Sequence, residues 1–198
     1  MPRLLHADKP PPPLLGRFHA TWRTAHEPVA GVSRRIQLLA YAVPLAVLPS
    51  SIWRLPVAFD GGLGPGERAY VVSLSILSEA FAFTAIGLIA RWGEVFPRWI
   101  PVLRGRRVPR TAAALPAATG SVILTLLFTF LFIASEIRGT TIRGGDQPAD
   151  FPSRAGGWEA AWFYVCYAPL TLWGPLLAVL TVAYWKRRST ARRGPATA

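Results

Sequence analysis

The sequence is poor in the residue types on which many enzymes and scaffolds depend. Cys166 is its only cysteine, which excludes a disulfide framework and a C-x-x-C thiol oxidoreductase. His6, His19 and His26 all precede the first long apolar segment, which excludes bundles that hold haem or a di-iron centre through histidines in their spans. A Gly-rich phosphate loop and a G-x-S-x-G motif are also missing. We therefore predict no metal site and no cofactor.

Charged residues are scarce as well, and they are biased to one sign. They make up 16% of the 198 residues, whereas soluble proteins carry about 25%. Lys and Arg number 22 against 10 Asp and Glu, so that the formal net charge is +12. Because 52% of the residues are hydrophobic, the chain is too apolar for a disordered protein. This composition indicates a membrane protein with basic flanks.

Four apolar segments are long enough to cross a bilayer, which takes about 20 mostly apolar residues. They cover about residues 36–53, 69–90, 115–135 and 160–185. Buried helices of a soluble all-helical protein, the competing interpretation, rarely exceed about 14 apolar residues. The predicted fold is an all-α, four-span transmembrane bundle over residues 34–188, between a Pro-rich, disordered tail (1–33) and a short tail (189–198).

Prolines interrupt two of these segments. Pro44 and Pro49 lie in the first segment, which is also the shortest, and Pro169 and Pro175 lie in the fourth. Since proline has no N–H and clashes with the preceding turn, we expect both helices to bend and to free backbone carbonyls.

The basic residues alternate from one side of the spans to the other. Seventeen precede the first span, lie between the second and third, or follow the fourth; five lie in the two remaining loops, namely Arg54, Arg68, Arg138, Arg143 and Arg154. The positive-inside rule then places both termini and the middle loop in the cytoplasm. We expect the membrane to be the plasma membrane. Because the basic residues flank apolar spans in three separate segments, we expect them to meet anionic headgroups and not nucleic acid.

The segment between the second and third spans, residues 91–109, combines arginines with aromatic rings. Such a mixture suits the membrane interface, where amphipathic rings settle at headgroup depth. Pro97, Pro101 and Pro109 prevent one continuous helix, so we expect a broken segment on the inner membrane surface. The residues predicted to lie at headgroups or at the interface are Arg91, Trp92, Arg98, Trp99, Arg104, Arg106 and Arg107.

Two motifs carry a resemblance to a known group of proteins. The first is W-G-x-x-x-P-x-W-x-P, which runs from Trp92 to Pro101, and the second is W-G-P at Trp173–Pro175 in the last span. Together they resemble uncharacterised small multi-span membrane proteins of actinobacteria, over about residues 36–188. The resemblance implies a topology and no activity.

Glu79 is the one ionisable residue near the middle of a predicted span, and such residues mark functional hypotheses by default. Ser75 and Ser78 share or border its helix face. Thr125 and Thr129 of the third span lie at a similar depth. One interpretation is a protonated Glu79 that is hydrogen-bonded to Thr125 or Thr129 and locks the two spans together. The other is a carboxylate that exchanges protons or binds a ligand.

Two further carboxylates lie at the outer ends of spans. Glu136 and Glu159 can reach water, and Glu136 can also reach Arg138, so we expect solvated caps. The alternative is a carboxylate cluster at the mouth of a cavity.

The leading functional hypothesis is a non-enzymatic accessory or interaction protein of the plasma membrane. It would pair with a second copy of itself or with another membrane protein, because four thin spans bury little surface on their own. The alternative is a transporter-like protein or a membrane enzyme that acts on an apolar lipid or terpenoid substrate through Glu79. A cavity against Glu79 and a second acid facing it would distinguish the alternative from the leading hypothesis.

Overall fold

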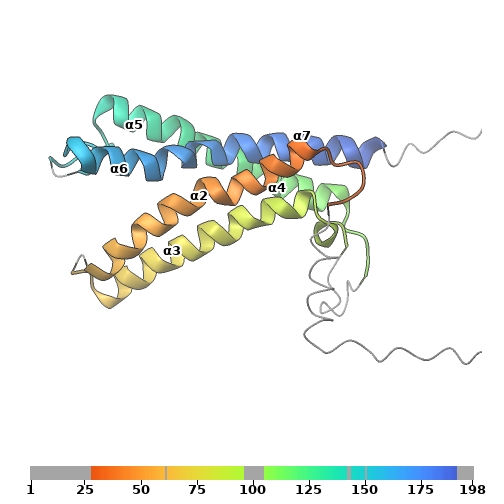
Figure 1. Cartoon of the computed structure of the whole chain (residues 1–198), viewed down its shortest axis with the longest axis horizontal. Helices are drawn as coiled ribbons and strands as arrows, with labels where there is room; N and C mark the ends of the chain where they lie inside the picture. The colour runs from red at the N-terminus through yellow and green to blue at the C-terminus, as the bar shows by residue number, and fades with distance from the viewer. Residues whose placement is uncertain (1–27, 61, 96–104, 142–143, 150, 191–198) are drawn as a thin grey trace, which may run out of the picture.

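The computed structural model describes residues 28–60, 62–95, 105–141, 144–149 and 151–190 (Figure 1). Most of the N-terminal tail, with its four consecutive prolines, lies outside the described residues. So do three of the residues predicted for the membrane interface, Arg98, Trp99 and Arg104.

The described chain is helical, with isolated β-bridges and no strand. The first span is α2 (Arg34–Asp60), and the second is α3 (Pro65–Thr84) with the 3-10 turn η1 (Ala85–Leu88); a short 3-10 turn, η2 (Arg91–Gly93), follows. The third span comprises α4 (Arg110–Leu124), the π-helical η3 (Thr125–Leu131) and α5 (Phe132–Arg138). The fourth comprises α6 (Gly157–Tyr167), the 3-10 turn η4 (Ala168–Leu172) and α7 (Trp173–Thr190). All four are long and apolar enough to cross a membrane, which confirms the predicted all-helical fold with four long apolar segments.

The largest difference from the predicted bounds is in the first span. We expected it to end near Trp53, but α2 continues to Asp60, and Arg54 and Pro56 lie inside the helix. Pro44 and Pro49 do not break α2 either, because an internal proline removes one backbone hydrogen bond while the rest of the helix is retained. The interruption falls in the fourth span instead, where η4 contains Pro169.

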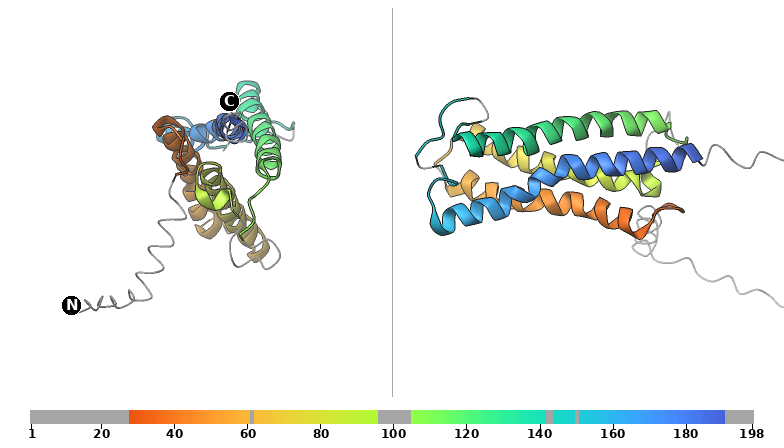
Figure 2. Two further views of the ribbon diagram at one scale, coloured as in Figure 1. Left: turned by 90° about the vertical axis from the view of Figure 1, so that its right-hand side faces the viewer. Right: turned by 90° about the horizontal axis from the view of Figure 1, so that it is seen from above.

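The four spans form two antiparallel pairs that meet along α2 and the fourth span. α2 packs on α3, α4 packs on α7, and α7 lies between α4 and α2 (Figure 2). We call the end where α2 and α4 begin and α7 finishes the termini end (residues 28–35, 88–95, 105–110 and 186–190). The opposite end is the loop end (residues 58–68 and 135–158). Towards the loop end, the α2–α3 pair leans away from α5 and α6 (Figure 1).

The surface of the bundle is apolar, whereas its interior contains hydroxyl groups. Phe81, Phe130 and Ile137 are 65%, 63% and 80% exposed. The buried positions include Ser50, Ser51, Ser75, Ser121, Ser135 and Thr181. Most of these hydroxyls donate to a carbonyl one turn earlier in their own helix. Exposed apolar surface of this extent suits lipid and not water, and small hydroxyl residues let transmembrane helices approach closely.

Candidate functional site

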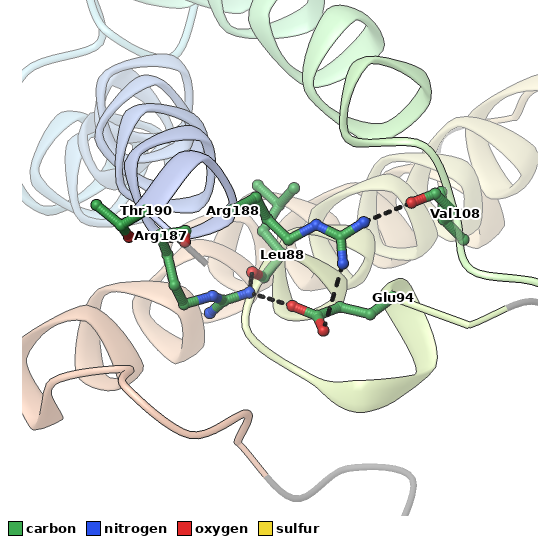
Figure 3. A network of polar contacts seen from close by, with 6 residues as sticks. All are labelled: Leu88, Glu94, Val108, Arg187, Arg188 and Thr190. Carbon is green, nitrogen blue, oxygen red and sulfur yellow. Dashed lines mark hydrogen bonds and ion pairs between the residues drawn. The ribbon is translucent and has the colours of Figure 1, made fainter. Parts of the chain in front are cut away.

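At the termini end, one carboxylate holds two arginines of the last span (Figure 3). Glu94 follows η2, while Arg187 and Arg188 lie in the final turns of α7. The Arg187 Nη2 atom donates to Glu94 Oε1 at 2.7 Å, and Arg188 Nη1 lies 3.6 Å from Glu94 Oε2. The side chains of all three residues are less than one fifth exposed. The sequence analysis did not single out Glu94, although it is the only acidic residue between the second and third spans.

The same two arginines also bind backbone carbonyls. Arg187 donates to the Leu88 carbonyl at 3.1 Å, and Arg188 donates to the Val108 carbonyl at 2.6 Å (Figure 3). Leu88 ends η1, where a helix leaves carbonyls without partners of its own. The Val108 N–H in turn donates to the Glu94 carbonyl at 2.8 Å. We call Glu94, Arg187, Arg188, Leu88 and Val108 the arginine clamp; it joins the second span, the middle loop and the fourth span.

A polar cavity of about 550 Å³ lies beside the arginine clamp. It is lined by Arg91, Glu94, Val95, Arg107, Arg187, Arg188 and residues 28–30. Four arginines therefore face it with one carboxylate. Arg91 and Arg107 are exposed, and neither forms an ion pair within the described part of the chain. Guanidinium groups in excess over carboxylates bind phosphate oxygens well, because their planar fork of donors matches phosphate geometry.

The residues predicted for the membrane interface have different surroundings. Arg91, Arg106 and Arg107 are exposed at the termini end, where headgroups could reach them. Trp92 is half-buried instead, since its ring stacks on Phe83 at 6.4 Å between centroids. Gly87 leaves room for this ring, because a Cβ atom there would lie 2.7 Å from it. Trp92 thus contributes to packing at the end of the second span.

The last residues of the N-terminal tail are anchored at the same end. Pro28 forms an antiparallel bridge with Ala90, and the Val29 N–H donates to the Ile89 carbonyl at 2.9 Å. Val32 packs against the core. Residues 28–32, at the end of the segment predicted as a tail, therefore contact the end of the second span and the core.

Within the spans, the predicted bond between Glu79 and the third span is not formed. Thr125 donates to the Ser121 carbonyl and Thr129 to the Thr171 carbonyl, both at 2.7 Å. The Glu79 Oε2 atom is buried and has no hydrogen-bond partner among the described residues. Matching depth along two spans was an unsafe guide, because it does not identify which helices are neighbours.

The polar face of the second span packs on the first span instead. Ser75 is buried, and the Ser78 hydroxyl lies 3.4 Å from that of Ser51. Helical periodicity places Glu79 on this same face. The sequence therefore predicted correctly which face of the second span is buried. It predicted the wrong neighbour, since the first span and not the third covers this face.

Thr125 and Thr129 pack against the fourth span at positions where its backbone is accessible to them. Pro175 has no N–H, so the carbonyl of Thr171, four residues earlier, lacks its helical donor, and Thr129 supplies one. One turn away, Gly174 lies so close to Thr125 that a Cβ atom there would be 2.7 Å from the Thr125 Cα. These contacts lie at η3, where the third span is π-helical, a distortion that is frequent at functional positions.

Arg54 is a half-buried charged residue that the sequence analysis assigned to a loop. Its Nη2 atom donates to Ser50 Oγ at 3.3 Å, and its guanidinium lies 5.8 Å from the ring centroid of Tyr167. Its Nη1 atom is buried without a described hydrogen-bond partner. Its spacing in the sequence could have predicted this position, because Arg54 lies on the same helix face as the buried residues Val43, Val47, Ser50 and Ala58.

At the loop end, Glu136 is not the solvated cap that we expected. Its Oε1 accepts from Gln147 Nε2 at 3.0 Å, and its Oε2 accepts from the Tyr164 hydroxyl at 2.7 Å. Gln147 comes from the loop between the third and fourth spans and is only 6% exposed. Glu136 therefore fixes this loop to both spans. Glu159 is exposed at the start of α6, in agreement with a solvated position.

A second cavity, of about 380 Å³, lies beneath this loop. We call it the aromatic cavity; its walls are Trp53, Phe128, Phe132, Phe151, Phe163 and Tyr167, with Ser135, Glu136, Thr140, Thr141, Gln147 and Pro152. The rings support one another: Phe163 stacks on Tyr167 at 4.7 Å, and Trp53 meets Tyr167 edge-on at 5.3 Å.

The candidate sites thus lie at opposite ends of one bundle. Comparisons with protein-family models, with curated proteins and with solved structures find no match to this chain.

Proposed function

We propose that the protein is a non-enzymatic accessory or interaction protein of the cell membrane, with four spans and both termini in the cytoplasm. Its termini end binds the anionic headgroups of the inner leaflet. The observation that carries this proposal is the cavity in which Arg91, Arg107, Arg187 and Arg188 face a single carboxylate, Glu94.

The distribution of charge over the two ends supports the orientation. The described basic residues of the termini end are Arg34, Arg35, Arg91, Arg106, Arg107, Arg110, Lys186, Arg187 and Arg188, against Arg68, Arg138 and Arg154 at the loop end. Cytoplasmic loops carry the excess of Lys and Arg in membrane proteins. Each basic residue near an anionic leaflet also gains about 1 kcal/mol.

The arginine clamp holds two of the cavity arginines in position before a headgroup binds. Glu94 and two carbonyls hold Arg187 and Arg188 in fixed positions, while Arg91 and Arg107 remain exposed beside them. A phosphate in the cavity would accept from guanidinium groups that need little ordering. Such preorganisation increases affinity, because less side-chain entropy is lost on binding.

The interaction role rests on the apolar outer surface. The third span is the least buried of the four, and it presents Val122, Ile123, Leu126 and Phe130 outward. A second copy of the chain or another membrane protein would pack on this surface.

Native mass spectrometry from mixed-lipid nanodiscs tests headgroup binding. The variant Arg91→Gln/Arg107→Gln removes two cavity arginines. Because these arginines would also donate to the bound phosphate, the variant should lower the retention of an anionic over a zwitterionic lipid by clearly more than the roughly 30-fold expected for the loss of any two basic residues near the leaflet, at about 1 kcal/mol each. Arg34→Gln/Arg35→Gln is the matched control, because these exposed arginines at the same end do not line the cavity. Equal losses in the two variants would contradict a defined headgroup site.

A second candidate function rests on Glu79, whose Oε2 atom is buried without a described partner. Such a group favours a ligand-binding or proton-exchanging carboxylate that acts on an apolar lipid or terpenoid molecule. Glu79 lines neither the basic nor the aromatic cavity. A small molecule that co-purifies with the wild type and with Glu159→Gln, but not with Glu79→Gln, would favour this candidate over the accessory role.

A further inference from the structure

Glu136 is a carboxylate held by neutral donors. Gln147 and Tyr164 bind its two oxygens, and within the described residues no Lys or Arg lies within ion-pair distance of it. Among the described residues that line the aromatic cavity, it is also the only one with a charged side chain. This half-buried carboxylate therefore has two hydrogen-bond donors but no ion-pair partner among the described residues.

The aromatic walls of the cavity also favour a cationic ligand. Phe132, Phe151, Phe163, Tyr167 and Trp53 surround the space, and the faces of aromatic rings attract cations, most strongly where water is excluded. Arg54 already lies over the Tyr167 ring, although it does not line the cavity. An anion would find no charged donor in the lining.

The loop above the cavity is held in a defined position. The backbone N–H of Gln147 donates to the Gly139 carbonyl at 2.9 Å, and the backbone carbonyl of Gln147 accepts from Arg154 at 3.1 Å. Phe151 of the same loop packs edge-on against Phe163 at 5.7 Å.

From these contacts we infer that the aromatic cavity binds a small organic cation of the arylalkyl-ammonium class. The ammonium group lies beside Glu136, and the apolar part lies against Phe132, Phe163 and Tyr167. A volume of about 380 Å³ is at the low end of the range for ligand sites, which limits the ligand to one ring and a compact charged head. This binding site is separate from the headgroup site at the termini end.

Isothermal titration calorimetry of the full chain in uncharged detergent tests the inference. The probe is benzyltrimethylammonium, and its uncharged isostere, (2,2-dimethylpropyl)benzene, has the same shape without the charge. Protein-free micelles give the baseline for each. We expect the wild type to bind the cation at least tenfold more tightly than the isostere.

Variants then test whether the Glu136 carboxylate binds the positive charge of the ligand. Glu136→Gln should weaken binding of the cation at least tenfold and leave binding of the isostere unchanged. Glu159→Gln, which removes an exposed carboxylate at the same end, should bind as the wild type does. Phe151→Leu, which removes one wall, should weaken binding of the cation several-fold.

Three results would overturn the inference: no binding of the cation, equal affinity for cation and isostere, or unchanged affinity in Glu136→Gln. If Glu136→Gln does not fold, the comparison of cation and isostere on the wild type still decides. None of these outcomes alters the lipid retention expected at the termini end.

Discussion

The two ends of the bundle are closed by opposite chemistry. At the termini end, guanidinium groups bind a carboxylate and backbone carbonyls, and positive charge remains in excess. At the loop end, aromatic rings pack around a carboxylate whose donors are neutral, and negative charge remains. At each end, charge of one sign lacks an ion-pair partner among the described residues: arginines at the termini end and Glu136 at the loop end. The two proposed ligands, an anionic headgroup and a small organic cation, differ in sign for this reason.

The largest expected effect concerns the backbone packing beneath the arginine clamp. A Cβ atom on Gly93 would overlap the carbonyl group of Gly87, so Gly93→Ala must displace η2 from the second span. Overpacking of this kind costs about 1–3 kcal/mol. The measurement is the unfolding midpoint in a titration with sodium dodecyl sulfate. Gly66→Ala is the control, because a Cβ atom there meets nothing within 4 Å; equal midpoints for the two variants would contradict the close approach.

Next in size is the loss of the clamp carboxylate. Glu94→Gln keeps the shape but removes the charge that pairs with Arg187 and Arg188. Its side chain is 18% exposed, and hydrogen bonds to charged groups contribute about 1.5–3 kcal/mol, so we expect a destabilisation of about 2 kcal/mol. Glu159→Gln should leave the midpoint unchanged. A Glu94→Gln protein as stable as the wild type would mean that the ion pairs do not close this end.

A smaller effect is expected at the loop end. Tyr164→Phe removes one of the two donors to Glu136 but leaves the stacked rings in place. A hydrogen bond to a charged group contributes about 1.5–3 kcal/mol, but Tyr164 is 41% exposed and solvent weakens the interaction, so we expect a destabilisation of about 1 kcal/mol. Tyr70→Phe is the control, since Tyr70 is exposed. If Tyr164→Phe destabilised the protein more than Glu94→Gln, the assignment of ion pairs to one end and aromatic packing to the other would be reversed.

The smallest expected effect is that of salt on the wild type. In about 1 M salt the Debye length falls to about 3 Å, which weakens the pairs of Glu94 with Arg187 and Arg188. Hydrogen exchange of the Val108 amide, which donates to the Glu94 carbonyl, should then become a few-fold faster. The backbone amide hydrogen of Gln147, which is donated to the Gly139 carbonyl, should exchange with solvent at an unchanged rate. Equal acceleration at both amides would remove the electrostatic difference between the ends.

The sequence predicted the number and character of the spans, because length and hydropathy are local properties of the chain. Their ends were less predictable: Arg54 and Pro56 suggested a loop, whereas α2 includes both residues. The face of Glu79 followed from helical periodicity, but its neighbour did not, since periodicity does not say which helix lies opposite. The clamp joins Glu94 to Arg187 and Arg188, over 90 residues apart in the chain, and no local pattern indicates such a pairing.

The most direct test of the account is the side of the membrane on which each end lies. Cys166→Ser gives a protein without cysteine, into which single cysteines can be placed at exposed sites. Ala155→Cys and Gly66→Cys report on the loop end, and Ala30→Cys and Thr190→Cys report on the termini end. The account predicts that an impermeant maleimide labels the first pair on intact cells and the second pair only after permeabilisation. Labelling of both pairs on intact cells, or of the second pair alone, would contradict the proposed orientation.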